Sequence, residues 1–222
     1  MGHQFTTASY VEAVGEVGYQ HWPAIPYWTM VCELDSMLRT ALLTENHHII
    51  RDAFLARFVE SVSSISEPTT TDLAAHQGMS TLSDEEKWQA LHLNRHCLPE
   101  VEDIASRHRR LAVVFARAAK QMQLRMADPF IANRGALTHV RIMVDIHLRG
   151  AVATLYIANR PDFVYKPRSL ATEAFFESIL AMLRETIPAS YVPNHPQFVN
   201  MAGYGFQEFV PYSAPKGHEG LQ

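Results

Sequence analysis

The stretch DIHLRGAVATLYIANRPDFVYKPRSL, residues 145–170, decides the fold of this chain. Within it Val152, Thr154 and Tyr156 alternate with Ala153, Leu155 and Ile157, and a period of two is typical of β-strands. Residues 163–166 form a second strand-like run. Turn-forming residues at 159–162 join the two runs, and Pro167, which has no backbone N–H to donate, ends the second. The stretch therefore predicts two neighbouring antiparallel strands that lead into a short connection.

The sequence around this pair of strands predicts the rest of a sheet. Alternation begins at about residue 136, which adds a strand before the pair. Residues 170–187 have apolar side chains at helical spacing, and Pro188 ends that helix. The segments 197–201 and 204–210 are again typical of strands. We therefore expect a five-stranded antiparallel sheet with one helix inserted after the third strand, an element order that the N-lobe of kinase-like enzymes also has.

The chain before the sheet has the spacing of helices. Residues 27–43, 48–65 and 100–127 put apolar side chains three and four positions apart. The predicted fold class is therefore α+β, with a helical region over residues 1–134 and the sheet with its helix over residues 135–212.

A loop is expected between the second and third of these helices. Residues 66–84 are polar and contain a proline, a run of threonines and a glycine. Ser83 followed three positions later by Glu86 has the pattern of a capping box, in which each residue satisfies a backbone N–H of the other. The loop is thus predicted to end there, at the start of a helix over residues 84–95.

Composition and charge exclude several classes of protein. Of the 222 residues 47% are hydrophobic and 19% are charged, which is ordinary for a globular protein. The formal net charge of -4 leaves no basic surplus for a nucleic-acid backbone. No apolar run is long enough to span a membrane, and the N-terminus lacks the pattern of a secretory signal. The two cysteines, Cys32 and Cys97, are expected to be reduced thiols, so we expect a soluble cytoplasmic protein.

Two clusters carry the chemistry of the predicted sheet. The first is residues 145–150, in the turn between the first two strands, where Gly150 would let the backbone approach an anion closely. The second surrounds Lys166 at the end of the third strand. A lysine there can meet ATP phosphates when a carboxylate on the following helix holds it in position. Glu173 and Glu177 are the candidates for that partner, and Glu177, further into the helix, is preferred.

These clusters resemble the dehydratase domain of class II (LanM-type) lanthipeptide synthetases. That family has an Asp-x-His turn, here Asp145 and His147, and then a glycine and an alternating strand. Its Val-Tyr-Lys-Pro-Arg-Ser-Leu motif is matched by residues 164–170, and its Tyr-Gly-aromatic-x-Glu-Phe-Val strand by residues 204–210. The resemblance covers about residues 98–212, and the motif around the lysine is the more specific part.

The resemblance implies a lipid-kinase-like fold that uses ATP and Mg²⁺ to phosphorylate serine and threonine of a precursor peptide. The same site then eliminates phosphate to give dehydroalanine and dehydrobutyrine. On this interpretation Lys166 holds ATP phosphates, and Asp145 and His147 serve phosphorylation or elimination. Arg168 contacts phosphate or anchors its turn. The other expected cofactor contacts are Gly150, Glu177 and Glu208.

The chain departs from the family pattern in two places. Where the family has Gly-Gly-Arg after the Asp-x-His element, this chain has Arg149, Gly150 and Ala151. The family's C-lobe, with an Asp-x-His-x-x-Asn loop and an Asp-x-Glu metal site, and its zinc-binding cyclase domain have no counterpart in these 222 residues. We therefore expect residues 213–222 to lead toward a missing C-lobe, and we expect no catalysis by this chain alone. The expected partners are the precursor peptide, a C-lobe and a cyclase domain.

Other interpretations of the same residues stay open. The chain could be a remnant that binds a peptide or partner without phosphoryl transfer, or an N-lobe of another kinase-like phosphotransferase. Lys166 could also be an ordinary solvated strand lysine. His92, His96 and Cys97 lie near one another in sequence, but Leu93 stands where a zincin helix needs glutamate, so no metal site is predicted.

Overall fold

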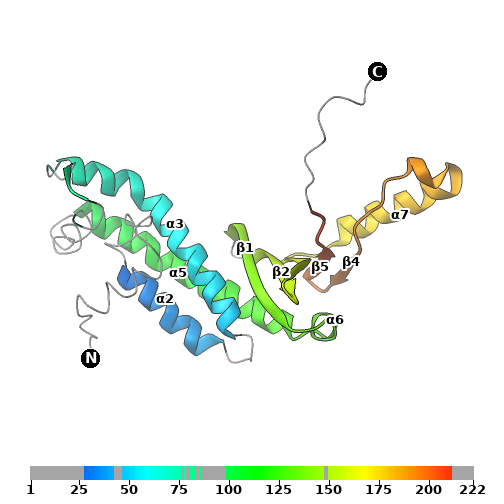
Figure 1. Cartoon of the computed structure of the whole chain (residues 1–222), viewed down its shortest axis with the longest axis horizontal. Coiled ribbons are helices and arrows are strands. Elements are labelled where there is room, and N and C mark those ends of the chain that lie inside the picture. Colours follow the sequence, from blue (N-terminus) through cyan, green and yellow to red (C-terminus); the bar gives the residue numbers. More distant parts are fainter. Residues whose placement is uncertain are drawn as a thin grey trace, which may run out of the picture. The chain divides into compact units, whose positions relative to one another are not determined.

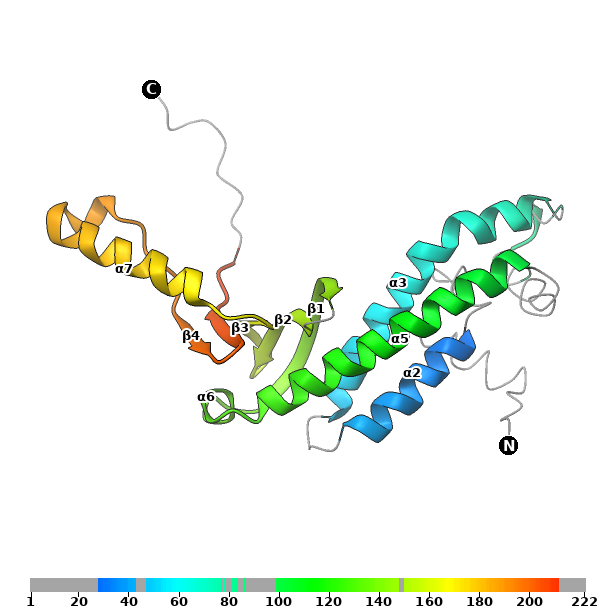
Figure 2. The same cartoon turned by 180° about the vertical axis from the view of Figure 1, so that it is seen from behind.

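The computed structural model describes residues 28–42, 47–76, 78, 81–83, 86, 99–147 and 150–211. The chain divides into two compact units, Met1–Arg125 and Met126–Gln222. Figures 1 and 2 draw them from opposite sides. Within the described ranges, every helix is too short or too polar to cross a lipid bilayer.

The first unit consists of helices. Its long elements are α2 (Trp28–Ala41), α3 (His47–His76) and α5 (Pro99–Met126), and they run alongside one another in both views (Figures 1 and 2). The apolar stripes predicted from helical spacing meet in a core, where the Phe58 and Phe115 rings lie edge to face with centroids 5.1 Å apart. The largest fully buried side chains of this unit are Leu34, Leu38, Ile50, Phe54, Phe58, Phe115 and Met122.

One predicted helix is longer than expected. The sequence placed its end at residue 65 and a loop over 66–84, whereas α3 continues to His76. Its backbone remains helical through Pro68, which removes one helical hydrogen bond but leaves the turns on either side able to continue. The prediction failed because the helical context on both sides of Pro68 outweighed the local cost of the proline and the threonine run.

The predicted capping box is confirmed. The backbone N–H and the hydroxyl of Ser83 both donate to Glu86 Oε2 at 2.8 Å, and the backbone N–H of Glu86 donates to Ser83 Oγ at 3.3 Å. The rest of the helix predicted over 84–95 lies outside the described residues.

The second unit is built on an antiparallel five-stranded sheet, as predicted. Its spatial order is β1-β2-β3-β5-β4, and α7 (Ala171–Thr186) lies in the chain between β3 and β4. A 3-10 turn, η4 (Ala189–Tyr191), follows the helix. The strands are β1 (Leu137–His147), β2 (Gly150–Ile157), β3 (Arg160–Lys166), β4 (Phe198–Met201) and β5 (Tyr204–Glu208). The α+β fold class with one inserted helix is thereby confirmed.

The turn between β2 and β3 is tighter than the predicted turn at 159–162. It consists of Ala158 and Asn159, which have φ values of 49° and 63°. Positive φ at both central residues is the geometry that matches the twist of a two-residue hairpin. Pro161 therefore already belongs to β3, and the pairing of β3 with β5 begins only at Phe163. The proline needs no ladder donor toward β5 at this position.

Aromatic side chains fill the core of the second unit. The Phe130 ring, on the short helix α6 (Pro129–Ala132), lies 5.2 Å from Phe163 and 5.8 Å from Phe206. Tyr165 and Phe206 are almost completely buried, with centroids 5.8 Å apart. This packing fixes β3 and β5 as neighbours, and β3 ends with Lys166.

Candidate functional site

Lys166 is the last residue of β3, and the pleat of the strand decides its direction. Phe163 and Tyr165 are buried on one face, so Val164 and Lys166 point to the other face, where both are only partly buried. In the register of the sheet, Lys166 lies opposite Gly205 of β5. The strand therefore presents the ammonium group at one end of the sheet, next to the start of α7.

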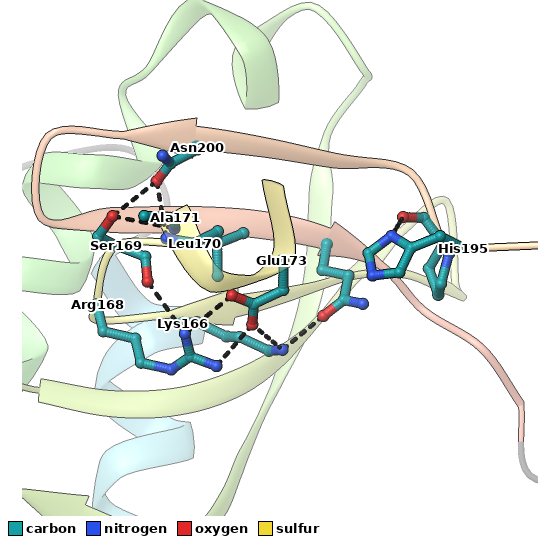
Figure 3. A network of polar contacts seen from close by, with 10 residues as sticks. Lys166, Arg168, Ser169, Leu170, Ala171, Glu173, His195 and Asn200 are labelled. Atoms are coloured by element: carbon teal, nitrogen blue, oxygen red, sulfur yellow. Dashed lines mark hydrogen bonds and ion pairs between the residues drawn. The ribbon is translucent and has the colours of Figure 1, made fainter. Parts of the chain in front are cut away.

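The connection from β3 to α7 is hydrogen-bonded to β4 through the side chain of Asn200. The backbone N–H of Leu170 donates to Asn200 Oδ1 at 2.7 Å, and the Ser169 hydroxyl donates to the same oxygen at 3.2 Å (Figure 3). The backbone N–H of Ala171 in turn donates to Ser169 Oγ at 3.2 Å. These bonds satisfy N–H groups at the start of the helix, which have no partner inside it. They fix the position of the first helical turn relative to the sheet.

Glu173 in that first turn brings two cations together. Its Oε1 lies 3.2 Å from Lys166 Nζ. Arg168 grips the same carboxylate with both terminal nitrogens, at 2.6 Å to Oε1 and 3.1 Å to Oε2 (Figure 3). The Glu173 side chain is 12% exposed, against 22% for Lys166 and 51% for Arg168. The carboxylate is thus mostly covered by a partly accessible lysine and a more exposed arginine.

The contacts with Arg168 and Lys166 determine the ionisation of Glu173. Hydrogen bonding from Arg168 lowers the pKa of Glu173 to about 2, and Lys166 adds to this effect, although burial opposes it. The same hydrogen bond raises the pKa of Arg168. At neutral pH the cluster therefore holds one carboxylate and two cations, which leaves it with a single net positive charge.

The preference for Glu177 as the partner of Lys166 was wrong. Glu177 lies one turn further along α7, where its Oε1 accepts from Arg184 Nη1 at 2.7 Å. Its Oε2 lies 3.9 Å from His195 Nδ1, in the segment that returns from the helix to the sheet. Because only four residues separate β3 from α7, the strand end meets the first turn of the helix rather than the second. Glu173 is the acidic residue in that turn.

The end of the first hairpin was predicted as a turn over 145–150 and is mostly strand. β1 extends to His147, which pairs with Gly150 at the start of β2, so Asp145 and His147 belong to β1. Gly150 has a φ of 123°, a region that L side chains rarely adopt. The side chains of Asp145 and His147 and the whole of 148–149 lie outside the described residues. Their roles, like a role of Gly150 at an anion, stay predictions.

Glu208, a predicted cofactor contact, makes a local contact at the end of β5. Its Oε2 accepts from the backbone N–H of Gln197 at 3.1 Å, and the backbone N–H of Glu208 donates to the Gln197 carbonyl at 2.7 Å. The side chain is exposed. These bonds join the residue before β4 to β5. A contact of Glu208 with a nucleotide stays a prediction.

Two residues that position this site were not predicted from the sequence. Gln207 of β5 accepts from Lys166 Nζ at 2.5 Å, and Asn200 of β4 holds the start of α7. Gln207 lies two positions after Gly205, the strand partner of Lys166, and thus on the same face of the sheet. The alternation of side chains along β5 shows that Gln207 and Lys166 share a face only once the register between β3 and β5 is known. No local signal marks either residue.

The cluster has the chemistry of an anion site rather than of a metal site. Two cationic side chains next to each other suit phosphate oxygens, since arginine offers a planar fork and lysine a compact charge. Among the described residues, no three His, Cys, Asp or Glu side chains come together in a way that could hold a metal ion. His92, His96 and Cys97, which were weighed as metal ligands from the sequence, lie outside the described residues.

A comparison with protein families finds a match, which covers the sheet and the site around Lys166. Residues 92–222 match the family described as Domain of unknown function (DUF4135). That match covers more than half of the chain, and the chain belongs to this family. It includes the whole of the sheet and the lysine cluster. No curated protein matches the sequence.

Proposed function

We propose that this chain carries the phosphate-binding part of a lanthipeptide dehydratase, which uses ATP to convert serine and threonine of a precursor peptide into dehydroamino acids. The observation that carries the proposal is the ion pair between Lys166, which belongs to the motif of residues 164–170, and Glu173 of α7. In protein kinases a lysine on the third strand contacts the ATP phosphates and pairs with a glutamate on the helix that follows. β3, α7 and this ion pair stand in the same sequential relation.

The proposed chemistry has two steps. In the first, the hydroxyl oxygen of serine or threonine bonds to the γ-phosphorus of ATP, the bond from that phosphorus to the β,γ-bridging oxygen breaks, ADP leaves, and the hydroxyl proton goes to a base. In the second, a base removes the Cα proton, the Cβ–O bond breaks, phosphate leaves and a double bond forms. Negative charge on phosphate oxygens must be stabilised in both steps, and stabilisation by fixed cations is the main source of catalysis in phosphoryl transfer.

The residues of the cluster fit the phosphate part of this scheme. Lys166 and Arg168 are the proposed phosphate contacts, and Glu173 holds both in position while leaving one positive charge unbalanced. Asp145 and His147 are the proposed proton-transfer residues, and Mg²⁺ bound by a further lobe would neutralise the transferring phosphate. The use of ATP also agrees with the cytoplasmic location that the sequence predicts.

The first test measures ATP binding by the 222-residue chain. We expect titration calorimetry with ATP and Mg²⁺ to detect binding, and we expect Lys166→Ala to raise the dissociation constant about tenfold or more, because a charged hydrogen bond to phosphate is lost. Lys120→Ala is the matched control, since Lys120 is an exposed lysine of α5 outside the cluster. Equal affinity of wild type and Lys166→Ala would contradict the proposal.

A second measurement separates the dehydratase from its alternatives. The protein as it is encoded in its genome is incubated with ATP, Mg²⁺ and a serine- and threonine-containing peptide encoded beside it. Mass spectrometry should show loss of water from the peptide, which depends on Lys166. A phosphorylated product that never loses phosphate would indicate another kinase-like phosphotransferase. Peptide binding with no ATP-dependent product would indicate a non-catalytic binding module.

A further inference from the structure

Lys166 is held by two acceptors from different elements. Glu173 Oε1 accepts from its Nζ at 3.2 Å and comes from α7 (Figure 3). Gln207 Oε1 accepts from the same Nζ at 2.5 Å and comes from β5. Gln207 is partly buried, as is Lys166. Gln207 thus contacts the ammonium group from the sheet, whereas Glu173 contacts it from the helix. Two contacts of this kind restrict a long side chain that would otherwise have many rotamers.

The number of donors on the ammonium group limits what it can still bind. A lysine ammonium has three N–H donors and no acceptor. Glu173 and Gln207 account for two of them, and the third has no acceptor among the described residues. A lysine held in this way can offer one directed hydrogen bond to a ligand oxygen without leaving either of its protein partners.

The charge of the second acceptor matters as much as its position. Arg168 and Lys166 carry two positive charges, and Glu173 carries one negative charge. Because the Gln207 amide is neutral, it contributes a hydrogen bond and leaves the net positive charge in place. A glutamate of the same length at position 207 would also accept from Lys166, but it would cancel that charge and weaken the attraction for an anion.

We infer that Gln207 is a positioning residue of the phosphate site, which directs Lys166 toward the phosphate chain of a nucleoside triphosphate while keeping the cluster cationic. The inference rests on the proposed function and extends it to a residue on β5. It separates two properties, the direction of the lysine and the charge of the cluster, and each can be changed by a different substitution.

The test compares two variants with a matched control. Gln207→Glu keeps the length and the acceptor but removes the net charge, and Gln207→Met keeps the length but removes the acceptor. Gln197→Glu introduces the same new charge at an exposed position just before β4, where its backbone rather than its side chain makes the described bonds. All proteins are titrated with ATP and Mg²⁺, and separately with inorganic triphosphate, which lacks the nucleoside.

We expect Gln207→Glu to weaken binding of both probes about tenfold, as loss of a nearby charge does. Gln197→Glu should weaken them clearly less, because residue 197 is hydrogen-bonded to Glu208 rather than to Lys166. Gln207→Met should weaken binding several-fold.

A readout independent of ligand is the acylation rate of Lys166 Nζ, measured by mass spectrometry across pH. Gln207→Glu should shift that profile to higher pH, because a second carboxylate favours the charged amine, and thermal unfolding checks that the variants fold.

The outcomes separate this inference from the proposed function. If the wild-type chain binds ATP and Gln207→Glu binds it equally well, the inference fails and the proposed function stands. An unshifted acylation profile in Gln207→Glu also overturns the inference, because the amide would then not contact the lysine. If the wild-type chain binds neither ATP nor triphosphate, the proposed function fails and the inference fails with it.

Discussion

Glu173 joins the two basic side chains of the cluster, and its own ionisation follows from that position. A carboxylate that is 12% exposed would normally resist ionisation, because burial disfavours the charged form. Here the two-pronged contact of Arg168 and the ammonium of Lys166 outweigh burial, so the pKa of Glu173 falls to about 2. The negative charge is what allows two cations to remain side by side.

The lowered pKa makes a prediction about stability against pH. A carboxyl group whose pKa falls on folding stabilises the protein above the pKa of the unfolded chain, near 4.5, and that contribution is lost as the pH falls through about 2. We therefore expect Glu173→Gln to lower the free energy of unfolding by about 1–2 kcal/mol at neutral pH, and the deficit to shrink toward pH 2. Urea unfolding at a series of pH values measures this difference. Glu185→Gln, at an exposed position of the same helix, should show no comparable pH-dependent deficit.

At the scale of elements, β5 and the start of α7 are in close contact. A Cβ atom on Gly205 would lie 2.5 Å from both Cγ and Cδ1 of Leu170, and 2.7 Å from the carbonyl oxygen of Val199. Leu170 itself is completely buried. Since Gly205 also lies opposite Lys166, the missing side chain is what lets the connection after β3 pack back onto β5.

We expect Gly205→Ala to lower the free energy of unfolding by about 1–3 kcal/mol, the usual cost of an overpacked core position. Chemical denaturation of the 222-residue chain measures it. Leu170→Ala removes two of the three clashing atoms but leaves the Val199 carbonyl. The double variant should therefore be more stable than the sum of the two single changes, without recovering wild-type stability. Strictly additive changes would mean that the clash with Leu170 does not determine the cost.

The elements also show what the sequence could and could not predict. The sequence order of the strands and the inserted helix could be predicted, because the spacing of apolar residues changes near residue 136. That spacing directly reflects which side chains are buried in a helix or a strand. The extension of α3 to His76 did not follow, because helix context overrode Pro68 and the threonine run. Lys166 was found from its motif. Gln207 and the choice of Glu173 over Glu177 depended on strand register and on the length of one connection, which are properties of the tertiary structure.

At the scale of the whole molecule, the phosphate-binding proposal depends on local charge. The chain carries a formal net charge of -4, so its overall field does not attract anions. Charges further apart than about 10 Å are largely screened at ordinary ionic strength. The contacts that decide anion affinity are therefore those within the cluster of Lys166, Arg168, Glu173 and Gln207. This is why a change of one charge at position 207 is expected to matter more than the net charge of the protein.

The apolar surface is unevenly distributed over the molecule. Half of the large apolar side chains that are exposed among the described residues fall within α7 and the turn after it. Three of the four charged residues of the helix, Glu173, Glu177 and Arg184, lie on its partly buried side instead. The exposed apolar residues of this segment are Phe175, Phe176, Met182, Leu183, Ile187 and Tyr191. Such a concentration of apolar surface is unusual, because most exposed apolar side chains on a protein are scattered singly.

This distribution predicts where a hydrophobic dye binds. We expect the 222-residue chain to enhance the fluorescence of anilinonaphthalene sulfonate, and Phe175→Ser combined with Met182→Ser to reduce that enhancement roughly by half, because the two changes remove the most exposed part of the apolar face of α7. Leu124→Ser is the control, since Leu124 on α5 has the same 67% exposure as Phe175. It should have little effect, because an isolated apolar side chain does not form a binding surface. An equal reduction by the control and the double variant would mean that the dye responds to total apolar exposure rather than to this helix.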